Sequence, residues 1–335
     1  MSTKPYILHG IAPSPYSVKM RALLRYRRLP FVWQADGTAR DVAVAAGLPP
    51  VIPVLRFPDG TLMNDSTPLA HALERAHPGQ RSIIPEDPAH AYLSDLLEDF
   101  GDEWVTKAMF HYRWFYAADR EFAQVWVITS RNPQMPEAAR REAMQAFNDR
   151  QVGRMAMVGC TDANRPVIED SYRFILDTLD PHVRKMEYLF GSRPSLADFG
   201  LFGQLQILSV DPTPMEEMRR RAPDVYCWLL RLDDASGVEG EWLAADAPLP
   251  GTLLALLKHC GETYLPFLSA NRAALEAGAP SVDLEILGRP WSQAPFRYQA
   301  KCYDALRKKL AALPANVRRR LDPVLADTGC LRWLA

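Results

Sequence analysis

Three short stretches near the start of the chain carry residue types that could do chemistry. In the first, Ser14 precedes Pro15 at the point where an apolar strand pattern gives way to helical spacing. Proline is favoured as the first residue of a helix, so Ser14 is expected at the N-cap. Its hydroxyl would either cap the helix or, helped by the positive end of the helix dipole, donate to an anionic ligand atom. The local residues leave both uses open.

The second stretch is Asp65 followed by Ser66, at the start of a helical pattern that runs to about His77. Free backbone N–H groups, a positive dipole end and a hydroxyl together favour a carboxylate ligand. The commonest use of either residue at this position is to cap the helix. Both uses can hold, because a cap with spare donors is an anion site.

The third stretch is Ile52 followed by Pro53. A cis proline would leave the backbone N–H and C=O of Ile52 free to pair with an extended peptide. The alternative is a trans proline at the start of an edge strand. Cysteine chemistry is not expected near these stretches, because the five cysteines all lie beyond residue 159, are odd in number and never form a CxxC pair. That pattern predicts neither a disulfide framework nor a metal site.

The spacing of apolar residues predicts an α/β unit followed by helices. The expected elements are a strand at 6–11, a helix at 16–28, a strand at 31–33, a short helix or turn at 42–47, a hairpin at 52–63 and a helix from 65 to about 77. A linker is expected at 85–88, then helices to 234, a Gly- and Pro-rich stretch at 235–251, helices near 253–274 and 298–313, and a strand pair around 282–287. The first unit needs helices on both faces of its sheet.

Composition limits the partners of the chain. A net charge of -1 and a pI near 6.7 give no general attraction to nucleic acid or to an anionic membrane. No apolar stretch approaches the roughly 20 residues that span a bilayer, and no signal peptide is recognisable. We therefore expect a soluble cytoplasmic protein without nucleic-acid or membrane partners.

Four motifs, spread in order over residues 14–199, resemble the soluble glutathione transferase superfamily. They are residues 14–21 (SPYSVKMR), similar to the serine-type motif; 51–55 (VIPVL), similar to Val-Pro-x-Leu with its cis proline; 65–67 (DST), similar to the acidic–Ser pair that opens the third helix; and 191–199 (GSRPSLADF), similar to the capping box of the helical domain. Each motif alone is a weak signal, whereas four in register are a strong one.

The resemblance implies an α/β plus all-α architecture. A thioredoxin-like domain is expected at 1–84 and a transferase-type helical domain at 85–238. Residues 239–335 have no counterpart in the common core and are expected to form a mainly helical extension packed on the helical domain.

The resemblance also implies a site for glutathione as co-substrate, with no metal. Ser14 would donate its O–H to the glutathione sulfur. Ile52, beside cis Pro53, would pair with the peptide backbone. Asp65 would bind the γ-glutamyl ammonium group, and Ser66 the γ-glutamyl carboxylate. A serine at position 14 disfavours the mixed-disulfide chemistry of cysteine-type members.

Some positions depart from the family pattern or stay open. Val51 stands where many relatives have Lys or Gln for the glycine carboxylate, and Gln34 or Arg40 could replace it. Tyr16 and Ser17 are rival hydroxyls to Ser14.

A run of aromatic residues around 100–116 reads as one helix. Its members include Trp104, His111 and Phe115. Aromatics on several faces are typical of a core helix, and His111 then reads as a satisfied core histidine. The resemblance implies instead that this helix borders the pocket for an electrophile, with Tyr16, Trp104, His111 and Phe115 as its candidate lining.

Two functions follow from this sequence. The first is transfer of the glutathione thiolate to a small hydrophobic electrophile by an enzyme that resemblance implies is a homodimer. The alternative is a non-catalytic binding or scaffolding protein with the transferase fold. Val51 and the long extension favour this alternative.

Overall fold

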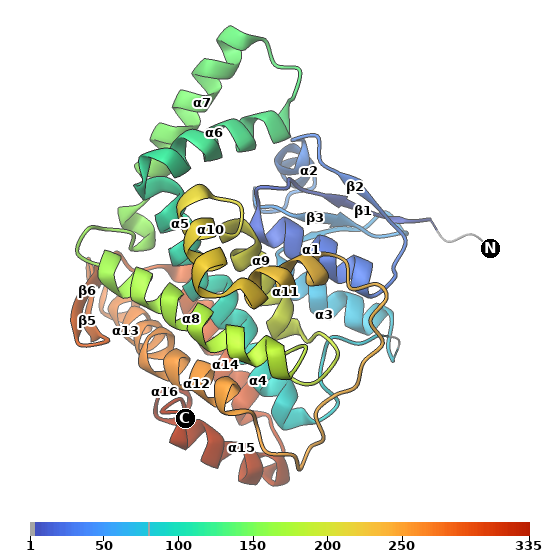
Figure 1. Ribbon diagram of the computed structural model, residues 1–335, viewed down its shortest axis with the longest axis vertical. Helices are drawn as coiled ribbons and strands as arrows, with labels where there is room; N and C mark the ends of the chain where they lie inside the picture. The colour runs from blue at the N-terminus through green and yellow to red at the C-terminus, as the bar shows by residue number, and fades with distance from the viewer. Residues whose placement is uncertain (1–3, 80) are drawn as a thin grey trace.

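The N-terminal part folds as a small sheet flanked by helices, in a computed structural model that describes residues 4–79 and 81–335 (Figure 1). In chain order its elements are β1 (Tyr6–His9), α1 (Pro15–Tyr26), β2 (Phe31–Gln34), α2 (Ala39–Ala45), β3 (Val54–Arg56), β4 (Leu62–Asn64) and α3 (Ser66–Ala76). The strand order is β2-β1-β3-β4, with β1 and β2 parallel and the other pairs antiparallel. This order confirms the predicted thioredoxin-like domain.

A helical region follows, as predicted. Its elements are α4 (Pro88–Phe100), the π-helical turn η1 (Gly101–Val105), α5 (Thr106–Phe115), α6 (Ala117–Arg131), α7 (Glu137–Val152), the short 3₁₀ turn η2 (Ala156–Val158), α8 (Arg165–Lys185), α9 (Leu196–Leu208), α10 (Pro212–Arg221) and α11 (Pro223–Asp233). The aromatic run is therefore not one regular helix. A π-helical turn interrupts it, and Tyr116, in extended conformation, ends it before α6.

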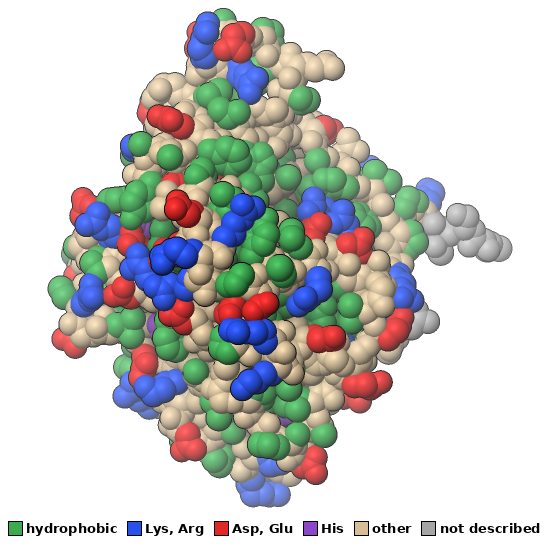
Figure 2. All heavy atoms as spheres, viewed as in Figure 1, with side chains coloured by type: hydrophobic (Ala, Val, Ile, Leu, Met, Phe, Trp, Pro, Cys, Tyr) green, Lys and Arg blue, Asp and Glu red, His purple; other side chains and the backbone are tan. Residues whose placement is uncertain are grey.

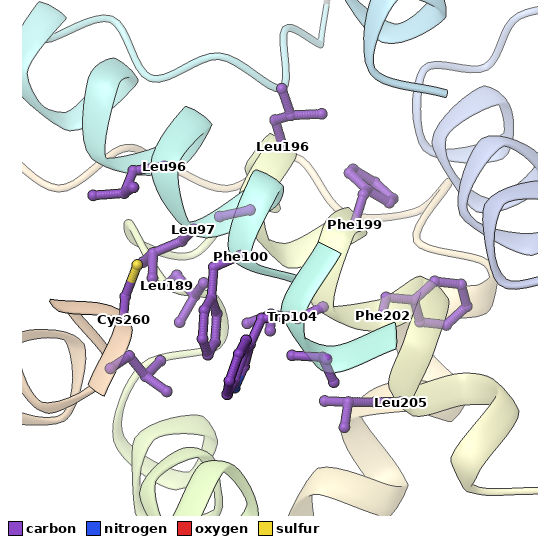
Figure 3. Close-up of a cluster of buried hydrophobic side chains, with 14 of the residues drawn as sticks. Leu96, Leu97, Phe100, Trp104, Leu189, Leu196, Phe199, Phe202, Leu205 and Cys260 are labelled. Carbon is purple, nitrogen blue, oxygen red and sulfur yellow. The ribbon is translucent and has the colours of Figure 1, made fainter. Parts of the chain in front are cut away.

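The core of this region lies where α4 and η1 cross α9. Figure 3 shows the side chains that meet there, among them Leu96, Leu97, Phe100, Trp104, Phe199, Phe202 and Leu205. The start of α9 is fixed by Asp198, whose carboxylate accepts the backbone N–H groups of Ser195 (2.8 Å) and Leu189 (3.0 Å). The predicted capping box of this helix is confirmed.

Two glycines on α9 let the neighbouring helices approach closely. A Cβ on Gly200 would lie 2.9 Å from the Cα of Glu98 on α4, and a Cβ on Gly203 would lie 2.9 Å from the carbonyl oxygen of Pro15 on α1. Because neither position has room for a side chain, α1 and α4 both pack against the backbone of α9. This arrangement brings the first turn of α1 close to the end of α4, where the candidate site lies.

The last hundred residues are folded against the rest of the chain. They contain α12 (Gly251–Glu262), α13 (Tyr264–Ala277), the hairpin of β5 (Val282–Ile286) and β6 (Arg289–Gln293), α14 (Arg297–Ala311), α15 (Ala315–Asp327) and α16 (Leu331–Leu334). The predicted helical stretch 253–274 is divided at Thr263, since Pro266 cannot donate to a preceding turn and is tolerated only near a helix start. The predicted strand pair is present.

This C-terminal segment contacts α4 and α8 through α12, and α4 again through α14 and α15. Two polar contacts reinforce the packing on α4. The Tyr264 hydroxyl donates to Asp99 (2.7 Å), and the Lys309 ammonium donates to Asp95 (2.7 Å). The segment also reaches the N-terminal domain, because the Tyr298 hydroxyl donates to Asp65 (2.8 Å). No pattern in the sequence indicates this last contact.

Deleting residues 239–335 is expected to cause aggregation, because it would uncover the apolar faces of α4 and α8. The segment buries Leu253, Leu256, Leu257, Tyr264 and Phe267. The measurement is size-exclusion chromatography with thermal unfolding of the shortened chain. A monodisperse product with unchanged melting temperature would contradict the packing described above.

The surface carries charges of both signs. On the face shown in Figure 2, lysine and arginine side chains alternate with acidic ones and with apolar patches. Among the described residues, no helix combines the length and apolar character needed to cross a membrane.

Candidate functional site

A cavity of about 500 Å³ lies where the N-terminal domain, η1 and the C-terminal segment meet. Its walls come from stretches far apart in the sequence. They are formed by Tyr16, Val51, Ile52, Asp65, Ser66, Asp102, Glu103, Thr106, Lys107, Arg154, Met157, Val158, Gln293, Phe296, Tyr298 and Gln299. Three of the residues predicted to bind glutathione, Ile52, Asp65 and Ser66, therefore share one cavity.

The peptide bond between Ile52 and Pro53 is cis, as predicted. The loop before it is held by Asn64, whose side-chain amide donates to the carbonyl oxygen of Pro49 (2.7 Å). Pro53 itself is buried, while Ile52 and the half-exposed Val51 face the cavity. A backbone of this form, just before the start of β3, can pair with an extended peptide.

Asp65 stands at the start of α3 with a left-handed backbone, φ 75°. Its side chain makes no capping hydrogen bond to the helix, so the capping alternative does not describe it. Instead its carboxylate accepts the Tyr298 hydroxyl at 2.8 Å. Burial raises the pKa of Asp65, while Tyr298 and Lys19 oppose this rise.

Ser66 belongs to a buried network around Lys19. The Lys19 ammonium lies 2.5 Å from Glu98 and 2.6 Å from Asp102, and the Ser66 hydroxyl donates to Asp102 at 3.2 Å. Burial would lower the pKa of Lys19, but the Asp102 and Glu98 carboxylates hold it well above its usual range. Lys19 is completely buried beneath the floor of the cavity, and the two carboxylates keep it charged.

Ser14 is the N-cap of α1. Its hydroxyl oxygen accepts the backbone N–H of Ser17 at 3.3 Å, and the preceding carbonyl, of Pro13, accepts from Arg113 at 2.9 Å. Within the described residues its own O–H has no acceptor, so it can still donate. Ser14 is 7% exposed and is not among the residues that line the cavity. Ser17, the other serine of the motif, is fully buried.

Tyr16, the remaining hydroxyl of the motif, does line the cavity. Its O–H donates to the backbone carbonyl of Asp102 at 3.0 Å and lies 3.4 Å from the Thr106 hydroxyl. Burial, Glu103 and Asp102 all raise the pKa of Tyr16. The phenol is therefore neutral and already has an acceptor.

The π-helical turn η1 directs two acidic residues, Asp102 and Glu103, to the cavity. Burial, helped by Asp99 and Asp102, raises the pKa of Glu103 well above its usual range, which favours the protonated form. Neither residue was predicted from the sequence. A cluster of acidic residues in an otherwise apolar helix, together with a lone lysine in the apolar helix α1, could have indicated them.

Three residues of the predicted electrophile pocket lie away from this cavity. Trp104 is buried and its indole N–H donates to Ser171 at 2.9 Å. His111 is completely buried, with Nε2 3.0 Å from Glu169, and its ring packs on Phe115 at 4.8 Å. Trp104 and His111 are part of the packed interior, the alternative that their spacing favoured, and Phe115 is half-buried beside His111. Of the four candidates, Tyr16 alone lines the cavity.

The two candidates for the glycine carboxylate differ in their surroundings. Gln34 donates to Asp36 at 2.7 Å and is held by that contact. Arg40, on α2, forms no ion pair with any residue that the structure describes, and burial together with Arg150 and Arg154 lowers its pKa. Arg154 also lines the cavity. No group of His, Cys, Asp or Glu in residues 4–79 and 81–335 is arranged to hold a metal ion.

Residues 8–81 match the family model of the glutathione S-transferase N-terminal domain. The sheet order and the cis proline of this domain agree with the match. The match covers the N-terminal domain alone.

Matches among solved structures include the following three proteins. The β-etherase LigF from Sphingobium sp. strain SYK-6 is 20% identical over 69% of this chain and 95% of its own, with a TM-score of 0.47. A glutathione S-transferase from Methylobacterium radiotolerans, crystallised with glutathione sulfonate, is 20% identical over 73% and 100%, with a TM-score of 0.39. The Tau class enzyme from mango is 19% identical over 69% and 89%, with a TM-score of 0.41. A search of curated proteins found no match.

Proposed function

We propose that this protein transfers the glutathione thiolate to a hydrophobic electrophile. The observation that carries the proposal is the convergence of the cis Ile52–Pro53 bond with Asp65 and Ser66 in one cavity. A free backbone edge and a helix N-terminus with an adjacent carboxylate are the groups that an extended tripeptide with charged ends requires.

Glutathione would lie along Ile52 with its γ-glutamyl end at α3. Asp65 would bind the ammonium group, and the N–H groups at the start of α3 with the Ser66 hydroxyl would bind the carboxylate. Arg40, a cation without an anionic partner in the described part of the chain, is the better candidate for the glycine carboxylate. Ser14 would donate its free O–H to the sulfur, with Tyr16 as the rival donor.

The acceptor would occupy the part of the cavity toward the C-terminal segment. Met157, Val158 and Phe296 supply an apolar wall there. A thiolate held beside an apolar acceptor needs no further catalytic group, because positioning supplies much of the rate. A homodimer and a cytoplasmic location remain predictions; sedimentation of the purified protein tests the first.

Asp65→Ala and Ser66→Ala are each expected to weaken glutathione binding by about 1.5–3 kcal/mol, the scale of a lost charge-assisted hydrogen bond. Calorimetric titration with glutathione is the measurement. Asp59→Ala, which removes an exposed carboxylate from the β3–β4 turn, is the matched control and should bind as the unmodified protein does. Unchanged affinity in both site variants would remove the basis of the assignment.

The alternative is a non-catalytic binding or scaffolding protein. One contact favours it: Tyr298 of the C-terminal segment already hydrogen-bonds to Asp65. A chlorodinitrobenzene conjugation assay beside a glutathione titration separates the two functions, since a scaffold without glutathione affinity would fail both.

A further inference from the structure

Lys107 is a buried lysine on the wall of the cavity that the proposed mechanism leaves unused. It lies in the first turn of α5 and is 2% exposed. Its ammonium group donates to the side-chain oxygen of Gln293 (2.7 Å) and to the backbone carbonyl of Val158 (3.1 Å). Both acceptors are uncharged, so they satisfy two N–H groups without neutralising the charge.

No carboxylate of the described residues forms an ion pair with Lys107. Glu103, one helical turn earlier, raises the pKa of Lys107, but the opposite effect of burial is larger. The pKa of Glu103 is itself raised, which favours the neutral form of that carboxyl group. Lys19 offers the contrast within the same molecule, because two carboxylates lie within 2.6 Å of its ammonium group.

The surroundings of Lys107 compensate its charge in part. The ring of Phe267 lies 4.5 Å from the ammonium nitrogen, and that of Trp291 lies 5.5 Å away. Such contacts stabilise an ammonium group by less than the burial of an unpaired ion costs. Burial accordingly lowers the pKa of Lys107 to about 8, which still leaves it mostly charged near pH 7. The positive charge of Lys107 is therefore without a negative partner until an anion enters the cavity.

The cavity offers an anion one buried position. Asp65 and Asp102 would repel a second carboxylate from the glutathione side, whereas Lys107 would attract it toward η2 and β6. Met157, Val158 and Phe296 lie on the same cavity and would contact an apolar body attached to that anion. A neutral donor at position 107 could form the same hydrogen bonds to Gln293 and Val158. These contacts therefore do not explain why the residue at this position is charged.

We propose that Lys107 binds an anionic group of the acceptor, so that the preferred acceptors are aromatic electrophiles that carry a carboxylate. This assignment rests on the proposed transferase function and names its substrate class. Lys107 orients the acceptor through that carboxylate while the ring meets the glutathione sulfur.

Two matched acceptors test the assignment: 2-chloro-1,3-dinitrobenzene, which is neutral, and 4-chloro-3,5-dinitrobenzoate, which adds a carboxylate para to the chlorine. In both, the sulfur forms a bond to the chlorine-bearing carbon and chloride leaves with the electron pair of the broken bond. The readout is the ratio of kcat/KM for the two acceptors, because a difference in intrinsic reactivity cancels between variants. Lys107→Met and Lys107→Gln should each lower the benzoate-to-neutral ratio about ten- to hundredfold, and Lys107→Arg should retain most of it.

Thermal unfolding establishes that each variant is folded. An unchanged benzoate-to-neutral ratio in both Lys107→Met and Lys107→Gln would overturn the role of Lys107. Conjugation of the neutral acceptor would in that case still support the transferase function. If the unmodified protein conjugates neither acceptor, equilibrium dialysis with unreactive 3,5-dinitrobenzoate and 1,3-dinitrobenzene decides the binding role. The binding role is supported if the unmodified protein binds the benzoate in preference to the neutral compound and Lys107→Gln loses this preference. It is contradicted if the unmodified protein and Lys107→Gln bind the benzoate equally.

Discussion

Replacing Ser14 by alanine is expected to raise the pKa of the bound glutathione thiol by one to two units and to slow conjugation about ten- to hundredfold near neutral pH. A free thiol with a pKa near 8.5 is only about 3% thiolate at pH 7. Lowering that pKa by two units requires about 2.7 kcal/mol. One charge-assisted O–H donor supplies about 1.5–3 kcal/mol, and a helix N-terminus adds about 0.3–1. The free O–H of Ser14 and the dipole of α1 are therefore sufficient without a general base.

The pH dependence of the conjugation rate measures this effect, with glutathione affinity measured in parallel. Affinity should change little, since Ile52, Asp65 and Ser66 hold the peptide. Because Tyr16 lines the cavity and Ser14 does not, Tyr16→Phe is the decisive comparison. A normal rate in Ser14→Ala with loss of activity in Tyr16→Phe would transfer the role to the tyrosine. Normal rates in both, and in Ser17→Ala, would rule out activation by a hydroxyl of this motif.

Lys19→Met should lower the free energy of unfolding by about 3–5 kcal/mol at pH 8, because it leaves the carboxylates of Glu98 and Asp102 buried without a cation. The loss should be smaller at pH 5. Burial raises the pKa of the Asp102 carboxyl to about 7, and Lys19 opposes this rise. Without Lys19 the pKa of Asp102 in the folded state stays above its unfolded value, so between those two values the folded state binds more protons than the unfolded one. The stability of the variant then falls as pH rises through that range. Denaturant unfolding at the two pH values is the measurement.

A neutral triple variant is the control for this prediction. Lys19→Met combined with Glu98→Gln and Asp102→Asn removes all three charges and should recover most of the stability, since replacing a whole buried ion pair is often close to neutral. A single variant as stable as the unmodified protein at pH 8 would show that the network contributes little. A triple variant less stable than the single one would contradict the account of the orphaned carboxylates.

The features that could be predicted from the sequence are those encoded by adjacent residues. Ser14 before Pro15, the Ile52–Pro53 pair and the Asp65–Ser66 helix start each specify a local backbone form, and together with the hydrophobic spacing they indicated the fold. The meeting of Ile52, Asp65 and Ser66 in one cavity follows from the order of strands and helices that this fold imposes.

The missed features depend on contacts between distant segments. Asp102, Lys107 and Tyr298 come from η1, α5 and the start of α14, and close packing of these elements brings them to one cavity, above the buried Lys19 of α1. No local pattern encodes that Tyr298 meets Asp65 across the fold. The π-helical turn was also missed, and its Asp102 and Glu103 line the cavity while its Trp104 enters the core.

A crystal structure of the protein with bound glutathione tests the central claim most directly. The account predicts that the peptide pairs with the backbone of Ile52, that its γ-glutamyl group lies against Asp65 and Ser66, and that its sulfur is within hydrogen-bonding distance of the Ser14 hydroxyl. Tyr298 would either share Asp65 with the ammonium group or move away from it. Two results would contradict the assignment of this cavity as the glutathione site. One is glutathione bound elsewhere, and the other is an empty cavity in crystals grown at saturating glutathione.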